Sequence, residues 1–367
     1  MIALLLLLAQ DLEEGDKAYK AGDYAKAVGH FEKAVASKPD AQVWLVLGSC
    51  YLRVERPKDA VKAFREALAL KAEGVDVHRA LGQALLNAGQ LDEAIASFRT
   101  AEARDPNGQD AYWIARVFIQ REEWTQAVYE LSRHRHAHPE SIETLETLAY
   151  VLGRSGRHGE SADAYRALAR RKPLETKYLV FVAQAEAAAQ RYGPAVDALE
   201  AARRRGAVDP AAARLLGDLY LTLNMPREAA AAYARLTDLK PDDWVRLGHA
   251  YLRSNETTSA REAFTKAGAR PDALTQLGHL SEPADARRLF KEAGAWGALG
   301  ELELKAGDAK AAAVAFAEAL KTDRSAAAHY HLALALKQAG QDEFPALRDG
   351  LREHPLDEKL RALLRAK

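Results

Sequence analysis

The sequence has a single cysteine, Cys50, and no excess of charge of either sign. One thiol cannot close a disulfide within the chain or supply the several cysteines of a structural zinc site, so both are excluded. The 52 Lys and Arg residues balance 52 Asp and Glu residues, which gives a formal net charge of zero. Proteins that bind along nucleic-acid phosphates usually carry a clear basic excess, so we expect no nucleic-acid partner.

Long apolar runs are also missing, apart from residues 1–10, MIALLLLLAQ, which an acidic stretch follows. Eight apolar residues in a helix reach about 12 Å, far less than a bilayer core of about 30 Å, so we expect no transmembrane anchor. The run resembles the apolar core of a secretory signal peptide. It predicts cleavage near Ala9 or Gln10 and export to a bacterial envelope, the periplasm or the medium. No Lys or Arg precedes it, and the alternatives are an apolar cap in a cytoplasmic protein or a start codon placed too late.

Known motifs of catalysis are absent. The chain contains no GxxxxGK[ST] phosphate loop, no GxSxG nucleophile elbow and no HExxH zinc helix. Cys50 follows Gly48 by two residues, at a position where a small packed residue is expected, and buried free cysteine behaves as a small hydrophobe. We therefore predict that the protein is not an enzyme and uses no cofactor.

A cluster of histidines is the one candidate for a metal site. His134 and His138 would lie one turn apart on a helix, with His136 pointing elsewhere. No acidic or fourth ligand is evident nearby, and His134 takes the repeat position of Ala67 and Ala101, which favours packing between helices. We predict no metal site.

What is abundant is a set of helix-forming residues spaced at a regular interval. Apolar residues make up 48% of the chain and charged residues 28%, with Ala, Leu, Glu, Arg and Lys prominent. Prolines recur at multiples of about 34 residues: Pro39, Pro106, Pro139, Pro173 and Pro241. Aromatic and small residues recur with the same period: Phe31, Phe64 and Phe98; Gly15, Gly48, Gly82 and Ala115; Ala27, Ala60, Ala94 and Ala127. Three residue classes with one period indicate a tandem repeat.

Each repeat reads as two amphipathic helices joined by a tight turn. In the repeat that begins near residue 75, Gly82 lies in the first helix, and Ala94 and Phe98 lie in the second. Gly89, between the two, suits a left-handed helix end. The small residues allow the paired helices to approach closely, and Phe98 fills the space beside them.

The string Trp44-x2-Leu47-Gly48-x2-Tyr51 resembles the signature of the tetratricopeptide repeat, and a second copy begins at Trp244 with a partial one at Trp296. The resemblance covers the chain after the apolar leader, with about ten to eleven repeats. It implies an all-α fold, a right-handed α-α superhelix of paired antiparallel helices. Expected repeat starts lie near residues 8, 41, 75, 108, 142, 176, 210, 241, 273, 293 and 326.

The repeats divide the chain into segments. After the leader of residues 1–10, residues 11–271 hold about eight repeats. Residues 272–292 form a shortened repeat, in which Gly278 precedes Ala286 by eight residues where other repeats have twelve, so a seam is expected there. Residues 293–367 hold two further repeats and a C-terminal capping helix with leucines on one face.

The resemblance also implies where a partner binds. In this family the first helix of each pair lines the concave groove, and ligand contacts fall three residues before, and one and five residues after, its small residue. The groove positions carried over are Arg79, Gln83, Asn87, Tyr112, Trp113, Arg116, Gln120, Tyr150, Arg154, Gln184, Arg214, Arg246 and His249. Tyr, Trp and Arg are enriched at binding hot spots, which makes Tyr112, Trp113, Arg116 and Tyr150 the expected groove centre. Packing between repeats is the alternative for Trp113.

Some family members bind a terminal carboxylate with Lys and Asn at these positions. Here Leu12 and Asp16, then Leu45 and Ser49, take those places, so this clamp is absent. We predict a scaffold or adaptor that binds a protein or peptide segment in the groove. The alternatives are a regulatory subunit of an enzyme or envelope assembly, and a nucleic-acid-binding helical repeat. The sequence predicts no particular oligomeric state.

Overall fold

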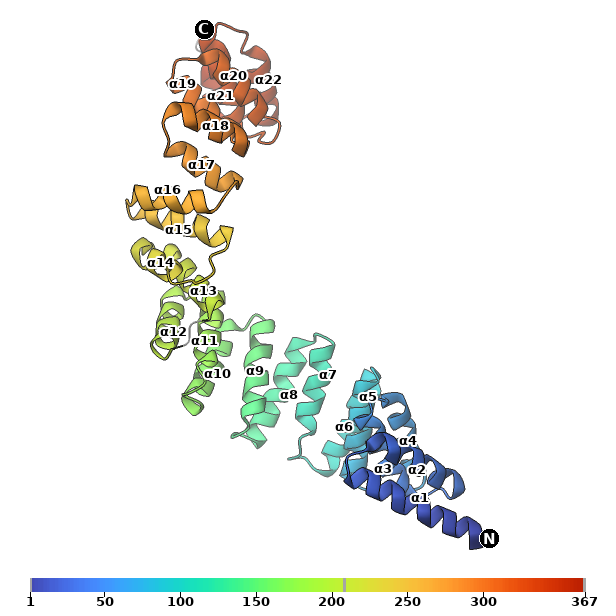
Figure 1. Cartoon of the computed structure of the whole chain (residues 1–367). Helices are drawn as coiled ribbons and strands as arrows, with labels where there is room; N and C mark the ends of the chain where they lie inside the picture. Colours follow the sequence, from blue (N-terminus) through green and yellow to red (C-terminus); the bar gives the residue numbers. More distant parts are fainter. Residues whose placement is uncertain (1, 207–208, 366–367) are drawn as a thin grey trace. The chain divides into compact units, whose positions relative to one another are not determined.

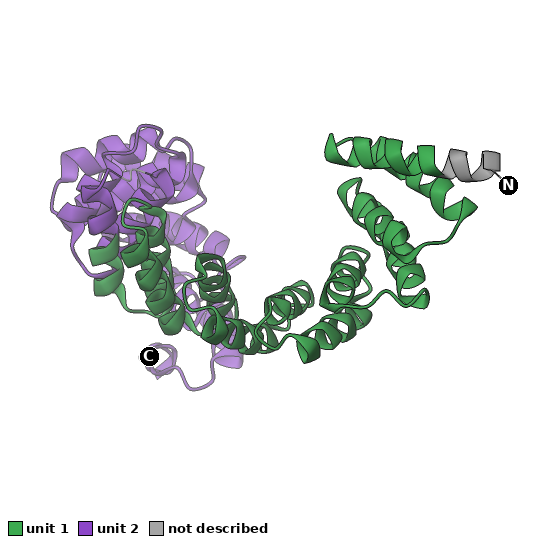
Figure 2. Ribbon diagram, turned by 90° about the horizontal axis from the view of Figure 1, so that it is seen from below, with its two compact units in different colours: residues 1–198 green, residues 199–367 purple. Residues whose placement is uncertain are grey.

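A computed structural model describes residues 2–206 and 209–365, and within these residues the chain contains helices and no strands (Figure 1). From α1 to α10 and from α13 to α22, the helices form consecutive antiparallel hairpins, in which an odd-numbered first helix packs against the even-numbered second helix that follows it. The chain divides into two compact units, residues 1–198 and 199–367, coloured separately in Figure 2. The all-α repeat fold expected from the sequence is confirmed.

Residues 1–198 contain five complete hairpins and the first helix of a sixth. Their helices are α1 (Ile2–Lys20), α2 (Tyr24–Ser37), α3 (Ala41–Arg53), α4 (Pro57–Ala69), α5 (Val75–Asn87), α6 (Leu91–Arg104), α7 (Asp110–Gln120), α8 (Trp124–Ala137), α9 (Ile142–Arg154), α10 (His158–Arg171) and α11 (Lys177–Ala188). The boundary between the units falls within α12 (Tyr192–Arg204).

Residues 199–367 continue the same alternation and end with a single short helix. Their helices are α13 (Pro210–Thr222), α14 (Pro226–Tyr233), α15 (Pro241–Arg253), α16 (Thr257–Lys266), α17 (Pro271–His279), α18 (Pro283–Ala293), α19 (Trp296–Lys305), α20 (Ala309–Ala319), α21 (Ala326–Gln338), α22 (Phe344–Glu353) and α23 (Glu358–Arg365). α23 packs on α21 and α22 and buries Leu360 against them.

One packing motif explains why the period carries glycine and phenylalanine. A Cβ atom built on Gly48 would lie 2.7 Å from the ring of Phe64, and one built on Gly82 would lie 2.7 Å from the ring of Phe98. Phe98 is fully buried, so its ring has no free space into which to move. The first helix therefore needs glycine where the aromatic ring of the second helix presses against its backbone. Between the two helices, Gly89 has a φ of 77°, the left-handed conformation expected of it.

Where alanine takes the place of glycine in the first helix, the residues of the second helix that face it differ as well. Opposite Ala149, Ser161 occupies the small position and donates its hydroxyl to the carbonyl of Ala149 at 2.7 Å. Opposite Ala115, the aromatic position holds the buried Leu131. The repeats thus keep one contact geometry with several residue combinations.

The shortened repeat forms a complete but smaller hairpin. α17 has nine residues and ends at His279, and Pro283 stands at the first position of α18, where its missing N–H costs no hydrogen bond.

The first helix of the chain is long by comparison, because α1 runs without a break from Ile2 to Lys20. In the described residues, no helix is both long and apolar enough to cross a bilayer.

Candidate functional site

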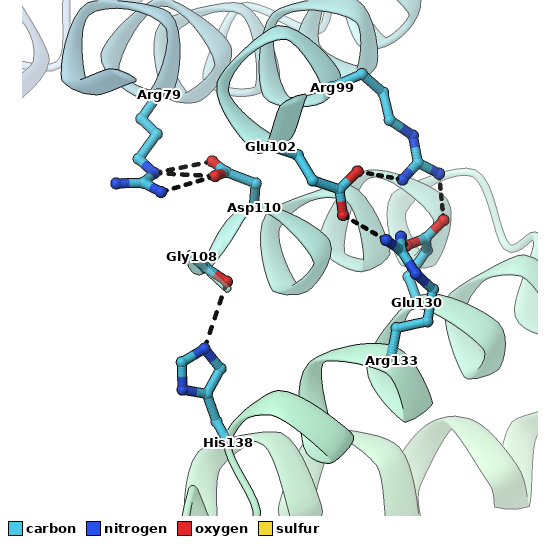
Figure 3. A network of polar contacts seen from close by, with 8 residues as sticks. All are labelled: Arg79, Arg99, Glu102, Gly108, Asp110, Glu130, Arg133 and His138. Carbon is cyan, nitrogen blue, oxygen red and sulfur yellow. Dashed lines mark hydrogen bonds and ion pairs between the residues drawn. The ribbon is translucent and has the colours of Figure 1, made fainter. Parts of the chain in front are cut away.

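On α5, α7, α9 and α13, the side chain three residues before the small residue of the first helix joins neighbouring repeats. Arg79 on α5 reaches Asp110 at the start of α7 through two of its guanidinium nitrogens, at 2.8 to 3.1 Å (Figure 3). Asp110 is 1% exposed, and Arg79 also donates to Asp105 at 2.6 Å. Hydrogen bonding to Asp110 raises the pKa of Arg79 above its ordinary value. Arg79, expected to contact a ligand, is therefore engaged within the chain.

Similar contacts join α7 to α9 and α9 to α11, and together with the contact between Arg79 and Asp110 we call them the ladder between first helices. Tyr112 on α7 is buried and donates its hydroxyl to Glu143 on α9 at 2.7 Å; burial raises the pKa of this tyrosine. Tyr178 on α11 donates to Glu146 on α9. The sequence places Tyr112 at the groove centre, whereas the structure places it in the core that holds two first helices together.

The positions one and five residues after the small residue are different, because on α5, α7, α9 and α11 their side chains are accessible to solvent. Gln83 is half-buried, and the other side chains on these positions are exposed. Tyr150 leaves 50% of its surface accessible, a high value for a large hydrophobic side chain. We call this set the first-helix face: Gln83, Asn87, Arg116, Gln120, Tyr150, Arg154 and Gln184.

Two arginines of this face rest on tryptophan rings. The guanidinium carbon of Arg116 lies 5.6 Å from the ring centre of Trp113, and that of Arg154 lies 5.1 Å from that of Trp124. The ring of Trp113 is in turn stacked on Phe98, with centres 6.2 Å apart. Trp113 therefore packs between repeats and also supports Arg116, and its contact with a partner stays a prediction.

The candidate positions in residues 199–367 are engaged in contacts within the chain. Arg214 pairs with Asp243 at 2.8 Å, and Arg246 pairs with Asp218 at 3.3 Å. His249 is half-buried, with its ring 5.3 Å from that of Phe264, and burial lowers its pKa. These three residues stay predicted partner contacts, but each would have to contact a partner while keeping its ion pair or ring contact within the chain.

Sequence reasoning missed an ionic network on the second helices, in which two half-buried arginines cover two carboxylates. Arg99 and Glu102 on α6 meet Glu130 and Arg133 on α8, and each arginine bonds to both carboxylates (Figure 3). Glu130 is 2% exposed. A charge this deeply buried requires such partners. The sequence does contain a signal for this network, because oppositely charged residues recur 31 residues apart, close to the repeat length.

The histidines and the cysteine occupy packed positions. His134 is buried, donates to or accepts from Thr144 Oγ1 at 2.8 Å, and has its ring centre 4.4 Å from that of His138. Burial, and then the nearby His138, lower the pKa of His134. His138 lies 3.4 Å from the carbonyl of Gly108 (Figure 3). Among the residues that the structure describes, no three His, Cys, Asp or Glu side chains are grouped to hold a metal. Burial raises the pKa of the Cys50 thiol to about 11, and the thiolate is the reactive form.

Comparison with known families gives matches along most of the chain. Models of the tetratricopeptide repeat match residues 12–75, 51–117, 146–210, 183–243 and 215–273. Curated relatives include the heat shock protein STI1 of Saccharomyces cerevisiae, 29% identical over 101 residues, or 27% of this chain and 17% of the relative. DnaJ homolog subfamily C member 3 of Bos taurus is 23% identical over 103 residues, or 27% of this chain and 20% of the relative. The match thus spans a fifth or less of these relatives.

Solved structures of similar fold include the C-terminal part of a repeat protein from Cytophaga hutchinsonii. It is 15% identical, with a TM-score of 0.49, and the alignment covers 69% of this chain and 92% of that one.

Proposed function

Because the chain belongs to the tetratricopeptide repeat family, whose fold is a non-enzymatic scaffold for protein interaction, we propose that it binds a peptide or protein segment on the first-helix face. The observation that carries the proposal is that some first-helix positions are bonded within the chain, whereas others are exposed and free to bind. Arg79 and Tyr112 are used to join repeats, whereas Arg116, Tyr150 and Arg154 are exposed on consecutive first helices. Exposed aromatic and arginine side chains on a rigid support are the usual composition of a binding hot spot.

Any catalysis in which the protein takes part is then supplied by its partner, which would make the chain a scaffold or a regulatory subunit. Nucleic acid is not favoured as the ligand. Net charge is zero, and many of the arginines along residues 1–198 are paired with carboxylates of the chain. We also propose that residues 1–10 direct export and are removed. The intact mass of protein isolated from its native compartment tests this, because removal predicts a chain that begins near Gln10 or Asp11.

Binding is best tested with two matched pairs of substitutions. The first pair, Arg116→Ala with Tyr150→Ala, truncates the first-helix face. The control, Tyr129→Ala with Arg135→Ala, removes the same residue types from α8, where Tyr129 is 63% exposed and Arg135 is exposed. Tyr150 is chosen over Tyr112 because removing a buried, hydrogen-bonded tyrosine would confuse loss of binding with loss of folding.

Peptides selected from a random display library against the wild-type chain serve as ligands. We expect the first pair to raise their dissociation constants by about thirtyfold or more, as loss of a hot spot of 2 kcal/mol does, and the control to leave them unchanged. Thermal melting by circular dichroism must be the same for all three proteins. If the control pair abolishes binding while the first pair does not, the working surface lies on the second helices.

A further inference from the structure

Five arginines in residues 1–198 lie over aromatic rings, and three of them, unlike Arg56 and Arg133, have no ion pair with a described residue. Arg53 lies 5.9 Å from the ring centre of Tyr24, in the same arrangement in which Arg154 lies 5.1 Å from that of Trp124. In both, the last residue of a first helix covers the aromatic residue that begins the preceding second helix. Arg116, in the middle of α7, is the third, over Trp113. All three side chains are exposed.

None of these three arginines forms a hydrogen bond or ion pair with another described residue. Arginines at other repeated positions are paired across repeats: Arg65 with Glu93, Arg79 with Asp110, Arg99 with Glu130 and Arg166 with Glu186. Arg53 and Arg154 close their helices, where a cation complements the helix dipole. Arg116 is seven residues into an eleven-residue helix, so the dipole does not explain it.

Carboxylates do lie near the first-helix face, but they have partners. Glu143 accepts the hydroxyl of Tyr112, and Glu146 accepts that of Tyr178 with Lys177 at 3.7 Å. The charged side chains that remain unpaired on this face are therefore cationic. A guanidinium covered on one side by an aromatic ring keeps its N–H edge free and its orientation restricted, which suits two-point binding of a carboxylate.

Arg53, five residues after Gly48, holds the equivalent position on α3 and extends the first-helix face by one further helix. We propose that the segment bound by this extended face is acidic, with Asp or Glu side chains placed on Arg53, Arg116 and Arg154. This rests on the proposed function and names the chemistry of its ligand. With first helices of successive repeats about 8–10 Å apart, as packed helices are, and an extended peptide advancing about 3.3 Å per residue, the carboxylates on Arg116 and Arg154 should be about three residues apart. Arg53 lies two repeats before Arg116, so its carboxylate should be about six residues from the next one. Recognition uses side-chain carboxylates along the segment, and a free C-terminus is not required.

The probe is a twelve-residue peptide with glutamate at every third position among serine and glycine, blocked at both ends and carrying an uncharged fluorophore. Versions with lysine or glutamine in place of glutamate are its controls. We expect the glutamate peptide to bind at least tenfold more tightly than the glutamine peptide at low salt, and the lysine peptide not to bind. Raising the salt to 1 M, where the screening length is about 3 Å, should remove the difference.

Two triple variants locate the interaction. Arg53→Gln, Arg116→Gln and Arg154→Gln should weaken binding of the glutamate peptide at least tenfold. The control variant carries Arg104→Gln, Arg135→Gln and Arg170→Gln, which remove three exposed, unpaired arginines from second helices. The two variants thus lose the same amount of positive charge. It should bind as the wild type does. Equal binding of the glutamate and glutamine peptides, or equal loss in both variants, overturns the proposal.

Failure of this inference can be told apart from failure of the proposed function. If library-selected peptides depend on Arg116 and Tyr150 but carry no acidic excess, the binding face stands and the acidic ligand is rejected. If no selected peptide depends on those two residues, the binding face itself is rejected.

Discussion

Replacing Gly82 by alanine should destabilise the protein, although alanine is the better helix former. In an exposed helix interior, Gly→Ala stabilises by about 1 kcal/mol. At Gly82 the new Cβ would lie 2.7 Å from Phe98 Cε1 and 2.8 Å from two further ring atoms, well inside contact distance. The ring is fully buried and stacked against Trp113, so it cannot rotate away without displacing the next repeat. Overpacking of this kind costs about 1–3 kcal/mol, which exceeds the gain in propensity in most of that range.

The matched control is Gly29→Ala on α2. Gly29 is exposed in the middle of its helix, and nothing lies within 4 Å of its added Cβ. It should therefore show the gain of about 0.5–1 kcal/mol without the clash. Gly82→Leu should be worse than Gly82→Ala by a further 1 kcal/mol or more, because three more carbons must be placed.

Guanidinium unfolding followed by circular dichroism measures both variants, and hydrogen exchange of α5 and α6 shows whether the loss is local, as repeat arrays can open in parts. Phe98→Leu in the Gly82→Ala background should cost less than the sum of the two single changes, because a smaller side chain relieves the contact. The reasoning is refuted if Gly82→Ala stabilises the protein as much as Gly29→Ala does.

Three further outcomes are expected. Arg79→Met should cost about 2–3 kcal/mol in chemical unfolding, because it leaves the carboxylate of Asp110 buried without its cation, whereas Arg116→Met should stay within about 0.5 kcal/mol; equal effects would contradict the ladder. Burial lowers the pKa of His134, so the fold favours its neutral form; its contribution to stability is complete above the unfolded value of about 6.5 and is lost as the pH falls from there toward the folded pKa. Urea unfolding between pH 7.5 and 5.5 should accordingly show a shallower loss in His134→Gln, and identical slopes would reject the assignment. Cys50 should react with a thiol reagent at pH 8 only slowly in the folded chain and rapidly after unfolding, since burial raises its pKa to about 11; rapid labelling of the native protein would show that the thiol is accessible.

The helical hairpins were predictable because their signals are local. Repeat starts expected near residues 41, 75, 142, 210 and 326 coincide with the first residues of α3, α5, α9, α13 and α21. The contact between Gly82 and Phe98 followed from the period alone, since a small residue must face a large one. The division at residues 198 and 199 did not follow, because the repeat pattern runs through α12 without interruption. The shortened repeat at residues 272–292, expected as a seam, is a small hairpin of α17 and α18.

The sequence says less about the candidate site than about the fold, and for a physical reason. The register identifies which side chains lie on first helices, but not which of them are already bonded, because the partners lie in the next repeat. Arg79 and Asp110 are 31 residues apart, as are Tyr112 and Glu143. Comparing charges at that separation would have paired Arg79 with Asp110 in advance and left Arg116 without a partner in the next repeat.

The ladder between first helices also limits how this chain can gain or lose whole modules by recombination. The direction of the hydrogen bond differs from one contact of the ladder to the next. Arg79 and Tyr112 donate to the next repeat, whereas Glu146 accepts from Tyr178 of the next repeat. Excising the repeat of α7 and α8 would bring Arg79 toward Glu143, and opposite charges would still meet. Excising the repeat of α9 and α10 would instead bring Tyr112 toward Tyr178, two hydroxyl groups that have each lost a carboxylate acceptor. The modules look alike in outline, yet only some of their junctions can be rejoined without loss.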